Sequence, residues 1–200
     1  MLAVCAFWLG ACPLSVWLGL KFLGRDIRNY GDGNPGAANV FRAGGRRVGA
    51  LALLLDVAKG VPFVLLAHSL FHLPESAITL VALSAILGHA FSPLLRLKGG
   101  KAIAITFGVL SALPQKDTLL AFAFIMFLGF LFIEIDAWIV MLGPSGTLAY
   151  LALSEGSSWE LIFMSCVLIL FTIKQFEDLK TVPRFRGKLI HWLLSRRRVT

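Results

Sequence analysis

Long apolar runs are the feature of this 200-residue sequence that most constrains its fold. They cover about residues 3–23, 48–70, 75–91, 102–113, 118–134, 137–154 and 158–174. Roughly 20 apolar residues in a helix cross the hydrocarbon core of a bilayer. Backbone polar groups at that depth must be hydrogen-bonded within the chain, which helices achieve. The runs therefore predict an all-α, polytopic membrane protein with about seven transmembrane helices.

The composition favours the same class. Hydrophobic residues make up 58% of the chain and the mean hydropathy is +0.81. Soluble domains contain roughly 45–50% apolar residues, and a soluble domain of this size could not bury so much apolar surface. The run at 102–113 is short, so we expect it to be tilted or partly inserted. We expect one integral membrane domain over residues 1–200.

The basic residues predict the orientation. Segment 24–47 carries five Lys/Arg, segment 92–101 carries three, and the chain from 174 onward carries eight, whereas the alternate connections carry only Lys116. With seven helices the basic segments share one side, which the positive-inside rule makes cytoplasmic, with the N-terminus outside the cytoplasmic membrane. Residues 180–200 read as a basic amphipathic cytoplasmic tail. The net charge of +8 thus implies membrane lipids and anionic substrates as partners, and no nucleic acid.

A glycine-rich segment on the basic side has the composition of an anion site. Glycines let the backbone adopt positive φ and approach a ligand, and successive N–H groups in such a turn bind anions. Arg42 can grip a phosphate with two parallel hydrogen bonds. An ordinary connecting turn is the alternative interpretation. The candidate phosphate-binding residues here are Gly31, Asp32, Gly33, Asn34, Gly36 and Asn39.

A second basic segment leads into the short run at 102. Lys98, Gly99, Gly100 and Lys101 place two ammonium groups and flexible backbone at the start of a helix, where free N–H groups attract anions. A basic loop that only sets the topology is the alternative. We expect residues 31–42 and 98–101 to lie together around one anion site.

Two ionisable residues lie inside the second apolar run, Asp56 and Lys59. Charges within a membrane are costly and are usually paired or functional. We expect a paired, supporting role for them. No metal or other cofactor is expected.

These motifs resemble those of the bacterial membrane acyl-phosphate:glycerol-3-phosphate acyltransferases. Leu9-Gly10-Ala11-Cys12-Pro13 is similar to the family's L-G-S-I-P, and residues 26–42 are similar to its D-I-R-x-x-G-S-G-N-x-G-A-T-N-x-x-R. A family-like L-D-x-x-K-G spans residues 55–60, and the G-H…K-G-G-K block matches residues 88–89 and 98–101. The resemblance covers roughly residues 9–106. It implies a seven-helix bundle with a cytoplasmic active site that moves a fatty acyl group from acyl phosphate to glycerol 3-phosphate in phospholipid biosynthesis.

The sequence departs from the family at several positions. Asp32 replaces the family serine, Ala38 replaces a threonine, and the final H-R-x-N-I motif has no match in residues 174–180. In the family, the late part of the chain that carries this motif helps to bind glycerol 3-phosphate. The resemblance therefore supports binding of acyl phosphate better than it supports glycerol 3-phosphate as the acceptor. A carboxylate beside a phosphate is repulsive unless a cation or a proton intervenes, so Asp32 should weaken phosphate binding. Alternatively, it caps the loop or pairs with Arg42 when substrate is absent.

The chemistry needs no nucleophilic side chain, because an acyl phosphate is already an activated anhydride. We assign Lys98, Lys101 and Arg42 to the phosphate charge, and the backbone of 31–39 to the cradle around it. His89 is a candidate base or orienting group, and equally a buried structural histidine. The catalytic candidates are therefore His89, Lys101 and Arg42. Two rivals remain: a non-catalytic membrane protein that binds anionic lipid or a partner, and an acyltransferase with a different acceptor.

Overall fold

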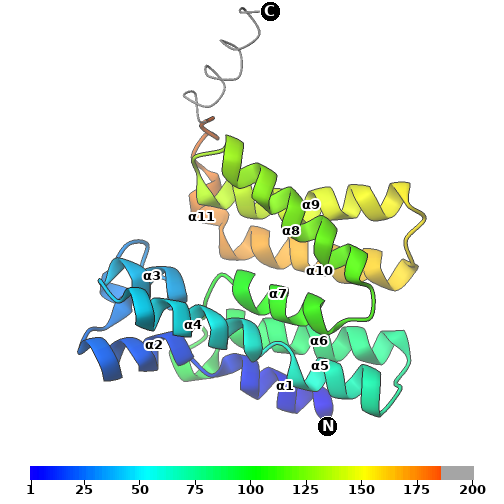
Figure 1. The fold of residues 1–200 in the computed structure, drawn as a ribbon, viewed down its shortest axis with the longest axis horizontal. Coiled ribbons are helices and arrows are strands. Elements are labelled where there is room, and N and C mark those ends of the chain that lie inside the picture. The colour runs from blue at the N-terminus through cyan, green and yellow to red at the C-terminus, as the bar shows by residue number, and fades with distance from the viewer. Residues whose placement is uncertain (186–200) are drawn as a thin grey trace, which may run out of the picture. The chain divides into compact units, whose positions relative to one another are not determined.

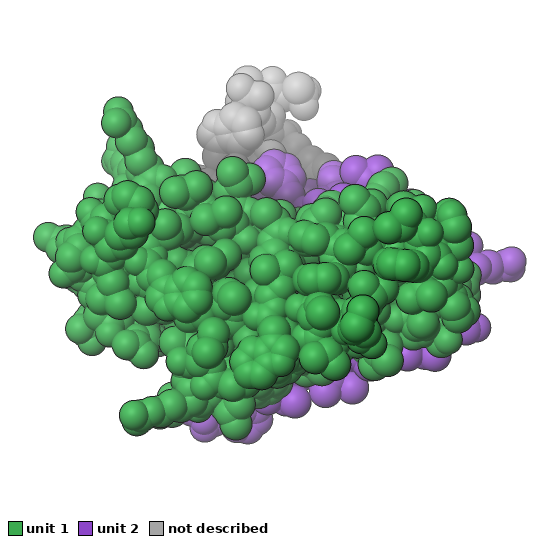
Figure 2. All heavy atoms as spheres, turned by 90° about the horizontal axis from the view of Figure 1, so that it is seen from below, with its two compact units in different colours: residues 1–116 green, residues 117–200 purple. Residues whose placement is uncertain are grey.

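The computed structural model describes residues 1–185, and these are helical apart from connections and one isolated antiparallel bridge between Ile133 and Phe185 (Figure 1). The expected all-α class is confirmed for this part of the chain. The molecule divides after Lys116 into two compact units, which Figure 2 draws in green (unit 1, residues 1–116) and purple (unit 2, from residue 117). Each unit is described by itself.

Within residues 1–185, four helical segments are long and apolar enough to cross a membrane: Leu2–Leu23, Arg46–Leu70, Glu75–Leu95 and Asp136–Leu153. Two more apolar helices, α8 (Lys116–Phe132) and α10 (Ser158–Lys174), have 17 residues each. Helix α7 (Ile103–Ala112) has 10 residues and is too short to span at 1.5 Å per residue. The expected count of seven spans therefore stays a prediction, whereas a protein with several membrane-crossing helices is confirmed.

The first segment of unit 1 is interrupted. It consists of α1 (Leu2–Ala11), α2 (Leu14–Leu18) and the π-helical turn η1 (Gly19–Leu23). Pro13 has no N–H and separates α1 from α2. The break leaves backbone carbonyls that need donors. The Ala11 carbonyl accepts a hydrogen bond from Ser92 Oγ at 2.5 Å, and the Cys12 carbonyl accepts one from Lys59 Nζ at 3.0 Å.

Close helix packing builds the rest of unit 1. The second segment comprises α4 (Arg46–Ala58), α5 (Pro62–Leu65) and the π-helical turn η3 (Leu66–Leu70), followed by α6 (Glu75–Ala90) and then α7. Helix α1 lies along α6, and a Cβ on Gly10 or Gly88 would collide with backbone of the opposite helix. Gly108 of α7 meets the Val57 carbonyl of α4 in the same way. Small residues thus let the backbones approach, as is typical of membrane helices.

Both connections predicted to form the site lie at one end of unit 1. Figure 1 shows α3 (Ala37–Arg42), in the first connection, at the end opposite the α5–α6 turn. Ile27 and Val40 are fully buried in a cluster with Val16 and Ala52, so the first connection is anchored to α2 and α4. Burying two such side chains contributes about 1.5–3 kcal/mol each, which fixes this connection to the helices.

Unit 2 contains α8, α9 (Asp136–Leu153), α10 and α11 (Phe176–Leu179). Ser157 and Glu160 form a capping box at the start of α10, and the buried Glu160 also accepts a hydrogen bond from Thr118 Oγ1 at 2.5 Å. This pairing ties α8 to α10. Most of the predicted tail, 180–200, lies outside the described residues, and residues 180–185 follow α11 without helical structure.

Candidate active site

The first connection owes its path to local backbone choices. Asp26 caps the 3₁₀ turn η2 (Ile27–Asn29) by accepting from the Arg28 amide at 3.0 Å, and α3 follows ten residues later. Gly31 has φ +56°, and a Cβ there would lie 2.6 Å from Asn39 Oδ1 and 2.8 Å from an Arg42 nitrogen. Only glycine fits that position, because it tolerates both the left-handed backbone and the lack of space.

Asn39 organises the loop from within. It is fully buried, and its side-chain amide donates to Asp32 Oδ1 at 3.0 Å and to the Asn34 carbonyl at 2.9 Å. Its own Oδ1 accepts a hydrogen bond from Arg42 Nη1 at 2.8 Å. In this structure Asn39, which was predicted as a phosphate ligand, contacts Asp32, Asn34 and Arg42 and holds them in place.

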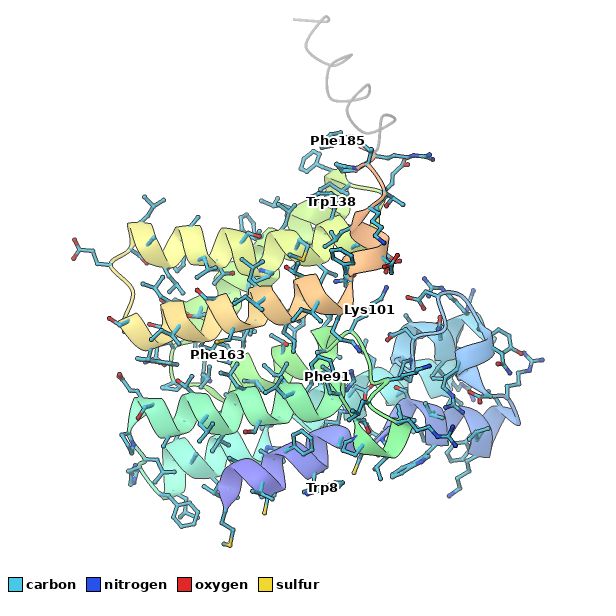
Figure 3. The ribbon with its side chains drawn as sticks, turned by 180° about the vertical axis from the view of Figure 1, so that it is seen from behind. Trp8, Phe91, Lys101, Trp138, Phe163 and Phe185 are labelled. Atoms are coloured by element: carbon cyan, nitrogen blue, oxygen red, sulfur yellow. The ribbon has the colours of Figure 1, made fainter. Side chains whose placement is uncertain are left out.

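The second connection, between α6 and α7, reverses direction tightly. After the 3₁₀ turn η4 (Pro93–Leu95), Arg96 and Leu97 adopt left-handed backbone with φ +53° and +64°. The Gly100 amide donates to the His89 carbonyl at 3.0 Å, and a Cβ on Gly100 would strike the His89 imidazole. The loop of residues 98–101 therefore folds onto the end of α6. Figure 3 labels Lys101 of this loop and Phe91, which follows α6.

One carboxylate joins the two connections. Asp32 Oδ2 lies 2.8 Å from Lys101 Nζ, and Asp32 Oδ1 lies 3.5 Å from Arg42 Nη1. The Asn34 amide donates to the same Oδ1 at 3.2 Å. The prediction that residues 31–42 and 98–101 meet is confirmed, and so is the pairing of Asp32 with Arg42. Lys101 is a partner of Asp32 that the sequence did not indicate.

The electrostatics of Asp32 follow from this arrangement. Partial burial is the largest influence and opposes ionisation, but hydrogen bonds from Lys101, the Asn34 amide and Asn39, with the Lys101 charge, outweigh it and lower the pKa of Asp32. Asp26 behaves similarly, because its hydrogen bond with the Arg28 guanidinium lowers the pKa of that carboxyl. Both carboxylates are ionised at neutral pH.

A cavity of about 540 Å³ adjoins this charged group. Its polar lining includes Asn34, Asp56, His89 and Lys101. The rest is apolar or glycine: Gly36, Ala37, Ala38, Leu53, Val57, Ala102, Ile103, Ala104 and Phe107. The apolar wall comes from α3, α4 and α7. A charged mouth against an apolar wall suits a ligand with an anionic head and a hydrocarbon tail.

Lys98 lines a different groove. That groove has a volume of about 670 Å³ and is also lined by Asp26, Arg28, Asn29, Gly33, Leu94, Leu95 and Arg96. Lys101 lines the first cavity and Lys98 lines this groove, so the two lysines do not share one cavity. Gly99 is buried against the His89 carbonyl and Ala90, which makes its role one of packing.

Asp56 and Lys59 form the expected pair beneath the cavity. Asp56 Oδ1 lies 2.8 Å from Lys59 Nζ, and each side chain is 3% exposed. Ser15 Oγ donates to Asp56 Oδ2 at 2.6 Å. Sequence reasoning missed Ser15 and Ser92; Ser92 directly precedes Pro93, and Ser15 follows Pro13 by two residues.

The chain is similar to known proteins over almost its whole length. A sequence model of the glycerol-3-phosphate acyltransferase family matches residues 1–182. A glycerol-3-phosphate acyltransferase of Lactiplantibacillus plantarum is 31% identical over 199 residues, covering 99% of this chain and 95% of that protein. One of Geotalea daltonii is 42% identical over 127 residues, 64% of each chain. The crystal structure of PlsY, an integral membrane glycerol 3-phosphate acyltransferase in its glycerol 3-phosphate form, superposes with a TM-score of 0.78 at 26% identity, over 90% of this chain and 88% of that one.

Proposed function

Because the chain belongs to the glycerol-3-phosphate acyltransferase family, we propose that it transfers a fatty acyl group from an acyl phosphate to glycerol 3-phosphate, with the group around Lys101 as its active site. The product is a lysophosphatidic acid, an early intermediate of phospholipid biosynthesis. The protein is an integral membrane acyltransferase. The proposal concerns the acyl donor, the acyl acceptor and the residues that bind them.

One observation carries the assignment of the site. Two cations from separate connections, Arg42 and Lys101, converge on the Asp32 carboxylate, and Lys101 also lines the apolar cavity. An acyl phosphate has its phosphate and its hydrocarbon chain on either side of one carbonyl. The cations would hold the phosphate while the chain enters the cavity between α4 and α7, where lipid-soluble substrate is within reach.

The reaction needs positioning and charge stabilisation. The acceptor hydroxyl oxygen attacks the acyl carbonyl carbon, a new C–O ester bond forms, and the bond between that carbon and the oxygen that bridges to phosphorus breaks. Inorganic phosphate leaves with the bonding pair and, overall, takes up the hydroxyl proton. Negative charge grows on the bridging oxygen, where Lys101 is held ready to stabilise it. Bringing the two substrates together supplies the rest of the acceleration.

His89 is a positioning residue in this scheme. It is buried, lines the cavity, and packs against Gly100, one residue before Lys101. Its imidazole therefore sets where the loop and the Lys101 ammonium lie. Asp56 faces the cavity from α4, fixed by Ser15 and Lys59, and supports its wall.

The orientation in the membrane is part of the proposal. Both basic connections of unit 1 lie at the end that carries the site, and the positive-inside rule places that end in the cytoplasm. The N-terminus would then be outside. Reporter domains fused after Arg47 and after Pro74 should appear on the cytoplasmic and external sides respectively. Reporters on the same side would contradict this topology.

The decisive experiment is a transfer assay with purified protein in micelles, long-chain acyl phosphate and labelled glycerol 3-phosphate. We expect labelled lysophosphatidic acid and an equal amount of inorganic phosphate. Lys101→Ala should lower turnover about 100- to 1,000-fold, the usual cost of removing one preorganised donor. The control is Lys21→Ala, which removes an exposed lysine that lies over the Phe22 ring, outside the site.

The two rivals give different results in the same assay. A scaffold without activity would consume no acyl phosphate with any acceptor. An acyltransferase with another acceptor would release phosphate only when glycerol 3-phosphate is replaced, for example by glycerol. Near-normal turnover of a correctly inserted Lys101→Ala variant would remove Lys101 from the mechanism.

A further inference from the structure

We propose that Asp32 is an internal competitor for the phosphate of the substrate: its carboxylate occupies the anion position between Arg42 and Lys101, and a bound phosphate must displace it. Asp32 would thereby set how tightly the site holds phosphate. The identity of the displaced ligand rests on the proposed function, whereas the competition itself rests on the geometry below.

The carboxylate makes contacts that a phosphate would make. Its two oxygens face four donors: the Arg42 guanidinium, the Lys101 ammonium, the Asn34 backbone amide and the Asn39 side-chain amide. Backbone and side-chain N–H groups combined with a guanidinium and an ammonium make a typical oxyanion site. The Asp32 carboxylate thus occupies an anion site that lies next to the cavity.

Asp32 is placed so that it can leave. It is flanked by Gly31 and Gly33, both with positive φ, and its side chain is 31% exposed. Rotation of the side chain toward solvent would break its contacts with Arg42 and Lys101. The loop would keep its shape, because Asn39 still donates to the Asn34 carbonyl and still accepts from Arg42.

The alternative role for this carboxylate is that of a general base for the acceptor hydroxyl. Partial burial opposes its ionisation, but the Lys101 ammonium and two amide donors stabilise the carboxylate more, and the pKa of Asp32 is lowered as a result. An efficient general base has a pKa near the working pH, and a carboxylate made more acidic moves away from it. Its contacts instead make it a counter-ion that a stronger anion can replace.

Displacement lowers affinity without abolishing it. A phosphate group carries about −1.5 to −2 charges at neutral pH, against −1 for a carboxylate, so it attracts the same two cations more strongly. Breaking the contacts of Asp32 with the two cations costs free energy, which offsets part of that attraction. The displaced carboxylate also stays nearby and repels the phosphate. Because Asp32 is partly exposed, solvent screens this repulsion, and we expect an effect on the order of tenfold in Kd.

The test measures binding of inorganic phosphate and of glycerol 3-phosphate by titration calorimetry of the full chain in micelles, in wild type, Asp32→Asn and Asp32→Ser. Asparagine keeps the size and an acceptor oxygen, and serine keeps a small hydroxyl. Both variants should bind either phosphate about tenfold more tightly. The matched control is Asp26→Asn, which removes a loop carboxylate that pairs with Arg28 at 2.7 Å.

Each outcome decides the matter. Tighter binding in both Asp32 variants, with unchanged binding in Asp26→Asn, supports the competition. Equal gains in affinity in all three variants would indicate a general effect of net charge and would overturn the proposal. Unchanged or weaker binding in both Asp32 variants would also overturn it, because the carboxylate would then have no effect on phosphate binding or would assist it. If both Asp32 variants unfold, the carboxylate is a structural part of the loop and the proposal is wrong. Because binding is measured without turnover, failure of the transfer assay leaves this result interpretable.

Discussion

Replacing Lys59 with methionine tests the buried pair beneath the cavity. The substitution keeps an unbranched side chain of similar length, but it removes the ammonium that lies 2.8 Å from Asp56 and 3.0 Å from the Cys12 carbonyl. The Cys12 carbonyl retains a second donor, the Leu14 amide at 2.9 Å. The loss therefore falls on Asp56, which keeps only its hydrogen bond from Ser15.

The expected cost is large because neither charge reaches solvent. Both side chains are 3% exposed, and breaking a buried ion pair by removing one partner typically costs about 3–5 kcal/mol. Replacing both partners with apolar residues is far less costly, because no unpaired charge remains. Lys59→Met should thus lower the free energy of unfolding by about 3–5 kcal/mol. The Asp56→Leu/Lys59→Met double variant should be more stable than Lys59→Met alone.

Equilibrium unfolding in mixed micelles with increasing SDS fraction, followed by circular dichroism, measures both quantities. Lys21→Met is the control, because Lys21 is exposed and lies over the Phe22 ring. A loss below about 1 kcal/mol for Lys59→Met would show that Asp56 is not held as a buried ion, since surface pairs contribute about that much. A double variant as unstable as the single would also refute the reasoning, because the unpaired charge could not then be the cause.

Three further outcomes follow from the site. Lys98→Ala should reduce turnover less than Lys101→Ala, because Lys98 lines the second groove, and an equal loss would place both lysines on one phosphate. Gly100→Ala should lower both turnover and melting temperature, since its Cβ would strike the His89 imidazole. Wild-type values for both would show that the loop can accommodate the Cβ. Asp32 has a lowered pKa, so its stabilising effect is complete above the unfolded-state pKa of about 3.9 and is lost as pH falls through the lower folded-state value. Asp32→Asn should therefore lack part of the wild-type acid-unfolding transition, which circular dichroism across pH 2–6 would detect, and an identical transition would contradict the assignment.

The general architecture could be predicted because it follows from local composition. Apolar runs give the helices, and the excess of basic residues puts residues 24–47 and 92–101 on one side, so their meeting was expected, whereas the pairing of Asp32 with Lys101 was not. The pairing of Asp56 with Lys59 was predictable for the same kind of reason, since a lone charge inside a membrane is too costly.

The finer assignments required the tertiary structure. Asn39 and Arg42 looked alike as phosphate ligands, yet Asn39 is fully buried and only Arg42 stays half-exposed at the mouth. Lys98 and Lys101 are three residues apart but line different grooves, and the chain reaches Lys98 through left-handed backbone at Arg96 and Leu97. Nothing in the residue types demands that conformation at 96–97, which neighbouring packing must impose against local preference.

The amphiphilic character of the cavity arises where polar and apolar residues are neighbours in the sequence. Lys101 contributes to the charged mouth, and the next three residues, 102–104, line the cavity with it. Ala102 has φ +63°, which ends the loop and begins α7 at Ile103. An acyl phosphate demands this proximity, because only its carbonyl carbon separates the phosphate from the hydrocarbon chain. A left-handed residue at that junction costs energy for any side chain but glycine. In the proposed function this residue joins Lys101, which would hold the phosphate, to the apolar residues that would hold the hydrocarbon chain.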